Sequence, residues 1–115
     1  MRERLRTIDV KAGMPLVEEG LARLEKELTR AMQAGVDVIR VIHGYGSTGK
    51  GRALREACRG YLCRLLKAGQ LKSFLPGEDY SKAANAGRDL MNRCPELRTS
   101  ERSDSQNPGI TFVEL

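Results

Sequence analysis

Apolar residues recur along two stretches of the chain at the spacing of amphipathic helices. The first stretch runs from Leu16 to Ala34 and follows Pro15, which suits the first turn of a helix. Its apolar members are separated by three or four positions and therefore lie on one face: Leu16, Val17, Leu21, Leu24, Leu28, Ala31 and Met32. The second stretch runs from about Arg52 to Ala68, and Gly69 ends it. Its stripe contains Leu54, Ala57, Cys58, Tyr61, Leu62 and Leu65.

Four shorter apolar runs predict strands before, between and after these helices. They cover Thr7–Val10, Val36–Ile42, Leu71–Leu75 and Ile110–Leu115. The order β-α-β-α-β-insert-β predicts an α/β fold, a two-layer sandwich in which two main helices pack on a mixed four-stranded sheet. Strands joined by helices are expected to pair in parallel, and the last strand to add antiparallel.

The segment 78–108 breaks this pattern and reads as an insertion. Tyr80–Arg93 predicts a helix with a thin apolar side, whereas Leu97–Pro108 is polar and is expected to be mobile. We therefore predict a single domain over residues 1–115, with a core of about 5–76 and 109–115.

Positive charge is concentrated in one part of the chain. The whole chain carries a net charge of +5. Between Lys50 and Lys72 there are seven basic residues and one acid, Glu56. A concentrated basic segment favours an anionic partner, with nucleic acid first. Two Phe, three Tyr and no Trp leave few platforms on which single-stranded bases could stack.

Little in the sequence indicates a membrane protein, a fold held by disulfides or a structural zinc site. No apolar run has the length of a membrane span, and the N-terminus lacks the apolar core of a signal peptide, so we expect a cytoplasmic protein with no membrane partner. Three cysteines without paired spacing, and one histidine, argue against a disulfide framework or a structural zinc site.

The segment His43–Gly51 places four glycines between a buried strand and a helix. Such a loop lets the backbone approach a phosphate, and the free N–H groups of the following helix point toward it. The candidate phosphate contacts here are Gly44, Gly46, Thr48, Gly49, Lys50, Arg52, Arg55 and Arg59. His43 either serves as an acid or base, or holds the loop by hydrogen-bonding a neighbouring carbonyl.

Gly44 to Gly51 also looks like a nucleotide-binding P-loop. Gly51 stands where the magnesium-binding hydroxyl should be, and no buried run ending in a suitable Asp follows. A small nucleotide- or phosphate-binding protein remains an alternative hypothesis.

The sequence VIRVIHGYGSTGKGRALREACRGYL resembles the second signature of small MutS-related (Smr) domains. The matching residues are His43, Gly44, Gly46, Thr48, Gly49, Leu54 and Arg55. Ile8-Asp9-Val10 is similar to the family's opening motif, although Lys11 and Ala12 replace its His-Gly. The glycine loop is also longer than the common form.

The resemblance implies a fold similar to the C-terminal domain of translation initiation factor three. It also implies DNA or RNA binding, and many members nick structured DNA or cleave RNA. Asp9 is expected near His43, and these two are the candidate catalytic pair, with Lys11 as a further phosphate contact. If the chain is an enzyme, we expect an endonuclease.

The main alternative is a catalytically inert module that docks on a ribosome or protein. The residues firmly imply no cofactor, and a divalent metal stays open because Asp9 is a single carboxylate. The choice between DNA and RNA and the oligomeric state stay open as well.

Overall fold

The computed structural model describes residues 3–44 and 49–115, and for Lys50 the backbone alone. Four strands are present in the described residues: β1 (Leu5–Asp9), β2 (Val38–Ile42), β3 (Ser73–Pro76) and β4 (Ile110–Glu114). Two long helices, α1 (Val17–Ala34) and α2 (Gly49–Lys67), follow β1 and β2. Each of these elements lies within a few residues of its predicted position.

The sheet has the order β1-β2-β4-β3. β1 and β2 pair in parallel, and β4 runs antiparallel to both β2 and β3. The antiparallel direction of this last strand agrees with the prediction from the sequence. One expectation was wrong: β2 and β3 do not pair with each other, because β4 lies between them. Four consecutive residues of β4, from Ile110 to Val113, are buried, which is the environment of a central strand covered on both faces.

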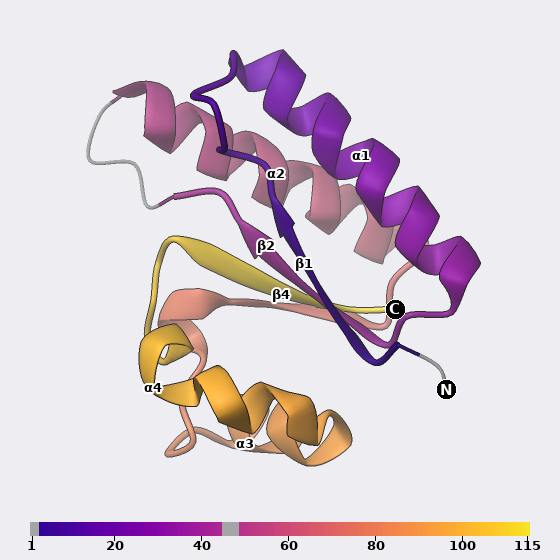
Figure 1. The fold of residues 1–115 in the computed structure, drawn as a ribbon, viewed down its shortest axis with the longest axis vertical. Helices are drawn as coiled ribbons and strands as arrows, with labels where there is room; N and C mark the ends of the chain where they lie inside the picture. The colour runs from indigo at the N-terminus through magenta and orange to yellow at the C-terminus, as the bar shows by residue number, and fades with distance from the viewer. Residues whose placement is uncertain (1–2, 45–48) are drawn as a thin grey trace.

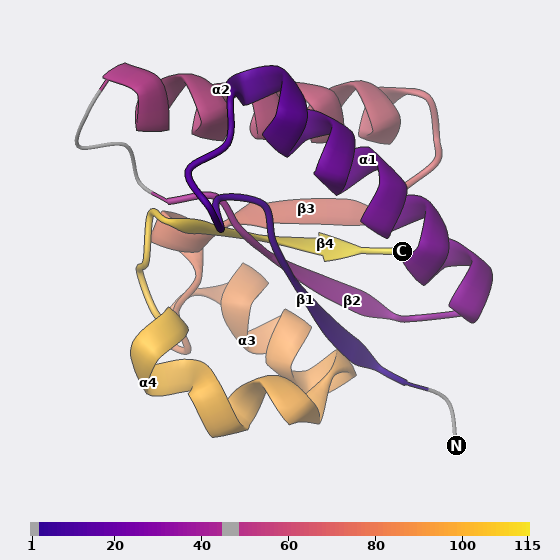
Figure 2. The same cartoon turned by 45° about the horizontal axis from the view of Figure 1, so that its top comes forward.

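The two faces of the sheet are covered by different segments. α1 and α2 lie side by side on one face, as predicted, and bury a core that includes Leu24, Ile39 and Leu62 (Figure 1). The segment between β3 and β4 covers the other face (Figure 2). It contains α3 (Asn85–Arg93), α4 (Glu101–Asp104) and two 3-10 turns, Gly77–Asp79 and Pro95–Ser100.

This third layer corrects the expectation that Leu97–Pro108 is mobile. Leu97 is fully buried in a second core with Tyr80, Leu90 and Phe112. Asp104 forms an ion pair with Arg40 of β2, with 3.0 Å between the nitrogen and oxygen atoms, and both side chains are largely buried. The polar segment therefore folds onto the sheet because a few of its residues contact the sheet directly. Leu97 packs in the second core, and Asp104 pairs with Arg40.

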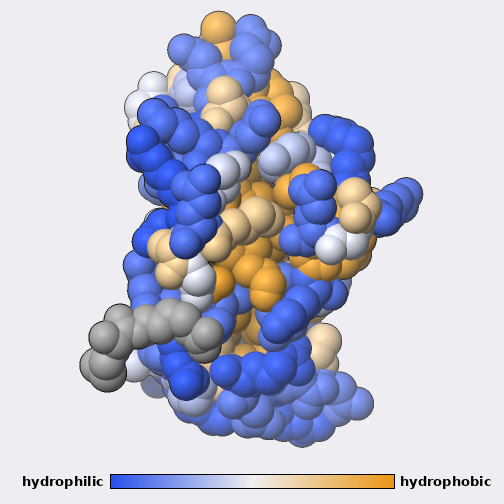
Figure 3. Space-filling view, turned by 90° about the vertical axis from the view of Figure 1, so that its right-hand side faces the viewer, coloured by the Kyte–Doolittle hydropathy of each residue, from blue (hydrophilic) through white to orange (hydrophobic). Residues whose placement is uncertain are grey.

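No helix in the described part of the chain is both long and apolar enough to cross a membrane. Seen from the side where both chain ends lie, apolar side chains occupy a band bordered by hydrophilic ones (Figure 3).

Candidate functional site

The glycine-rich corner lies where β2 ends and α2 begins. Gly44 has a positive φ of 78°, a conformation that glycine adopts without strain, and α2 starts at Gly49. Two of the predicted phosphate contacts, Gly46 and Thr48, lie outside the described residues, as does the side chain of Lys50. The structure therefore describes the two sides of the corner, which are the strand ends up to Gly44 and the helix from Gly49 onward.

His43 anchors the first flank from inside the fold. Its ring is 1% exposed, and its Nδ1 lies 2.7 Å from the carbonyl oxygen of Gly44. Its Nε2 lies 2.8 Å from Oγ1 of Thr111, which also accepts a hydrogen bond from Nε of Arg59 at 3.1 Å. Because the Gly44 carbonyl can only accept, Nδ1 carries the imidazole proton, and in the neutral ring Nε2 accepts the hydrogen bond from the Thr111 hydroxyl.

The charge state of His43 follows from the same environment. Burial lowers its pKa to about 4, and the nearby positive charges of Arg59 and Arg55 act in the same direction. The ring is therefore neutral near pH 7, with both nitrogens occupied. This arrangement favours the hypothesis that His43 holds the loop over the hypothesis that it exchanges protons with a substrate.

The guanidinium of Arg59 forms hydrogen bonds with other parts of the chain. Its guanidinium contacts both carboxylate oxygens of Glu78, with Nη1 2.8 Å from Oε2, and its Nη2 reaches the carbonyls of Pro108 and Ile110. This bidentate pair lowers the pKa of Glu78. Arg59 was predicted to contact phosphate, but its donors are committed to Thr111, Glu78 and the backbone. Thr111 and Glu78 carried no signal in the sequence.

Asp9 and Lys11 form the neighbouring flank, at the end of β1. Asp9 pairs with Ile42 in the sheet, so the two strands end side by side, as the resemblance implied. The exposed carboxylate of Asp9 accepts the backbone N–H groups of Lys11 and Ala12 at 3.0 and 3.1 Å. In the described residues, no group of three or more metal-ligating side chains gathers.

Lys11 reaches from this flank across to the glycine corner. Its Cδ lies 3.3 Å from the point where a Cβ would stand on Gly44. The aliphatic stem therefore packs over the glycine, while the residue as a whole stays exposed. A side chain at position 44 would press against this stem, so the glycine permits the close approach.

The opening turns of α2 add further cations. No acid stands in the first turn, Arg52 is exposed, and Arg55 is near enough to His43 to influence its pKa. The structure thus places Lys11 against Gly44 and Arg55 near His43, whereas Arg59 turns inward.

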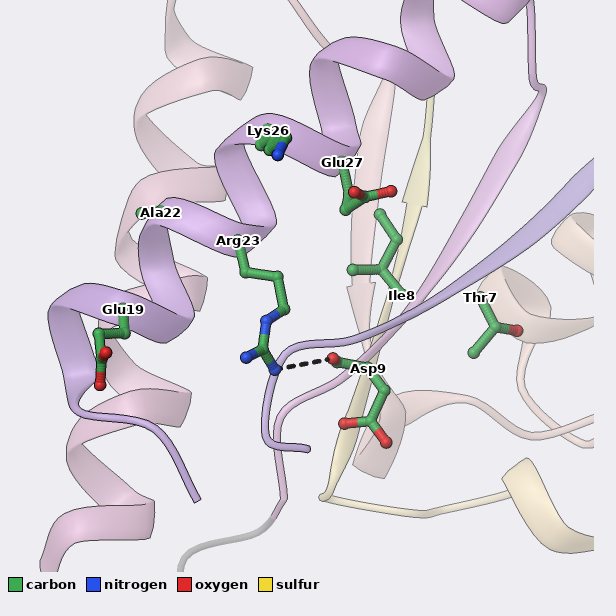
Figure 4. A pocket seen from close by; sticks show the side chains of 8 residues that line it. All are labelled: Thr7, Ile8, Asp9, Glu19, Ala22, Arg23, Lys26 and Glu27. Carbon is green, nitrogen blue, oxygen red and sulfur yellow. Dashed lines mark hydrogen bonds between the residues drawn. The ribbon is translucent and has the colours of Figure 1, made fainter. Parts of the chain in front are cut away.

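Arg23 of α1 is a residue that sequence patterning did not single out. Its Nη1 donates to the carbonyl oxygens of Asp9, Val10 and Ala12, at 3.5, 3.4 and 2.9 Å. It thereby ties the end of β1 to α1 and borders a pocket along β1 (Figure 4).

Comparisons with known proteins identify the family and support the fold. A family model described as the Smr domain matches residues 12–86. Among solved structures, the chain is similar to the Smr domain of MutS2 from Thermus thermophilus, with 23% sequence identity and a TM-score of 0.55. That match covers 97% of this chain and 96% of the other, and it shows a shared fold. No curated protein matches the chain.

Proposed function

Because this chain belongs to the Smr domain family, we propose that it binds DNA or RNA at the corner where β1 and β2 end and α2 begins. The family is generally linked to nucleic-acid binding and nuclease activity. The proposal assigns the binding of the polynucleotide backbone to this corner.

The observation that carries the proposal is the position of Lys11 across Gly44. It brings a cation from the end of β1 onto the glycine that leads toward α2. α2 begins at Gly49 with no acid in its first turn, and Arg52 and Arg55 lie in its opening turns, so cations and the positive end of the helix dipole meet at this end of α2. Backbone amides and cations that converge from two elements favour a phosphate.

These contacts predict how binding behaves. Lysine, arginine and backbone amides that hold phosphates position a nucleic acid without reading its bases. We therefore expect a steep dependence on salt and little dependence on sequence.

The same geometry favours binding over cleavage. Lys11 stands where the resemblance leads one to expect a histidine, and it acts as a point charge. His43 is buried and neutral, which leaves Asp9 as the exposed acid in this flank. The catalytic pair Asp9 and His43 stays a prediction, which His43→Ala and added Mg²⁺ or Mn²⁺ would examine in a nicking assay.

The binding test compares two double variants with equal loss of charge. Fluorescence anisotropy would measure the affinity of the full chain for a labelled RNA hairpin and a four-way DNA junction over a range of salt concentrations. Lys11→Ala with Arg55→Ala should weaken binding to both by about tenfold and reduce the salt slope by about two, one for each lost phosphate contact. Lys67→Ala with Lys72→Ala removes two exposed cations, one from the last turn of α2 and one from the segment after it, and should change little.

Equal losses in the two double variants would show that net charge, and not this corner, drives binding. No measurable binding of either nucleic acid by the unaltered chain would contradict the proposal outright. Tight binding of ATP or GTP instead would favour the nucleotide-binding alternative.

A further inference from the structure

The open edge of β1 presents backbone groups without partners. Val10 N–H donates to Ile42 O, and Arg4 O accepts from Val38 N–H, so the even-numbered residues of this strand face β2. The N–H and C=O groups of successive residues point to opposite sides of a strand. Leu5, Thr7 and Asp9 therefore direct theirs outward, and those of Leu5 and Thr7 find no partner among the described residues.

α1 overhangs this edge and turns it into a groove. Thr7, Ile8 and Asp9 line one wall, and Ala22, Arg23 and Lys26 lie across from them on the helix (Figure 4). Glu19 and Glu27 complete the lining, and the pocket has a volume of about 570 Å³. The space lies where a further strand would run beside β1.

Two cations on the helix wall of the groove, Arg23 and Lys26, form no ion pair with an acid among the described residues, whereas Asp9 on the strand wall accepts the N–H groups of Lys11 and Ala12. The carboxylate of Glu19 accepts the backbone N–H of Leu16 at the start of α1, and Glu27 pairs with Arg30 at 3.1 Å. Arg23 uses only Nη1 in its bonds to the end of β1. Lys26 is exposed and pairs with no acid among the described residues. A ligand that carries a carboxylate would complement Arg23 and Lys26.

We propose that this groove binds an extended polypeptide segment with an acidic side chain, which adds to the sheet as a fifth strand beside β1. The addition of a strand to a sheet edge is a general mode of peptide recognition. The proposal does not depend on nucleic-acid binding at the glycine corner, because it uses the opposite side of β1 from β2.

The edge itself distinguishes a peptide from other occupants. The outward carbonyls of Leu5 and Thr7 need donors, and their N–H groups need acceptors. A peptide backbone supplies both in alternation, whereas a phosphodiester backbone supplies chiefly acceptors. A second copy that paired through its own β1 would bring its overhanging α1 into the space that the first α1 occupies, which disfavours that occupant.

The test selects ligands with the full chain and then alters single edge groups. Phage-displayed random 12-residue peptides would be panned on the protein, and the best binders synthesised for anisotropy measurements. Thr7→Pro removes an outward N–H without touching the ladder to β2, since proline is tolerated at such positions of edge strands. Thr7→Val is the matched control: it also loses the hydroxyl that Arg40 contacts, but it keeps the N–H.

We expect acidic peptides to be enriched, Thr7→Pro to weaken their binding at least tenfold, and Thr7→Val to change it less than twofold. Lys26→Glu should weaken binding at least threefold, and amide spectra would confirm that each variant is folded. Failure to enrich any peptide would overturn the proposal, as would binding that is indifferent to Thr7→Pro. Displacement of the peptide by a single-stranded DNA 20-mer would assign the groove to nucleic acid instead.

Discussion

Two arginine–carboxylate pairs, Arg59–Glu78 and Arg40–Asp104, lie on opposite faces of the sheet and have different surroundings. On the face covered by α1 and α2, Arg59 contacts Glu78, whose side chain is 41% exposed. On the opposite face, Arg40 contacts Asp104, and these side chains are only 15% and 9% exposed. The first pair continues through Thr111 to His43 and the glycine corner. The second continues to Ser100 and Thr7 and joins the third layer to the sheet.

We therefore expect the two pairs to have different roles. One contributes mainly to stability, and the other mainly to the orientation of neighbouring side chains. Water screens a pair that is partly exposed, so Arg59 and Glu78 contribute little net energy. Their value lies in the orientation of Thr111 and His43. A largely buried pair behaves otherwise, because removal of one partner leaves the other charge desolvated and uncompensated. The comparison therefore predicts that the Arg40 side of the sheet is the more sensitive to loss of a carboxylate.

The largest effect should come from Asp104→Ala, which leaves Arg40 charged and buried without its acid. We expect the free energy of unfolding to fall by about 3 kcal/mol, measured by urea denaturation. Glu78→Ala is the matched change on the other face and should cost less than about 1 kcal/mol. An equal decrease in the free energy of unfolding for the two variants would contradict the predicted difference between the two faces.

An intermediate effect should follow acidification, through His43. Its pKa in the folded chain is lowered to about 4, so the unfolded chain binds a proton more readily. The stability from neutral His43 is complete above the usual pKa of 6.5 and is lost as the pH falls toward 4. The free energy of unfolding should drop by about 2 kcal/mol between about pH 7 and pH 5.

The chain has one histidine, so His43→Gln provides a clean control for this pH dependence. In that variant, stability should change little over the same range. A slope that persists in His43→Gln would show that another group is responsible.

A smaller effect than that of acidification should come from Thr111→Val, which removes the hydroxyl between Arg59 and His43 at nearly constant volume. We expect a cost of about 1 kcal/mol, since two polar groups lose a buried partner. Because this link holds the corner, affinity for the RNA hairpin should fall as well. Asp104→Asn should leave that affinity unchanged in protein that remains folded. A Thr111→Val variant that binds RNA normally would separate the buried network from the binding surface.

Much of the candidate site could be predicted from local sequence. The glycine loop after a β-branched strand placed the corner correctly, and the parallel β1 and β2 brought Asp9 beside it. The roles of individual cations could not be read in the same way. Arg52, Arg55 and Arg59 belong to one basic segment of one helix, yet Arg59 turns toward Glu78, 19 residues away.

Local sequence was enough to predict the two long helices, the four strands and the position of the loop, because apolar periodicity and glycine act over a few neighbouring residues. Long-range contacts were needed to show that β4 lies between β2 and β3, that 97–108 folds onto the sheet, and that His43 is buried and neutral. Each of those outcomes depends on a partner far along the chain: Thr111 for His43, 68 residues away, and Ser100 for Arg40, 60 residues away. A local pattern carries no information about such partners, since they meet only when the sheet has formed.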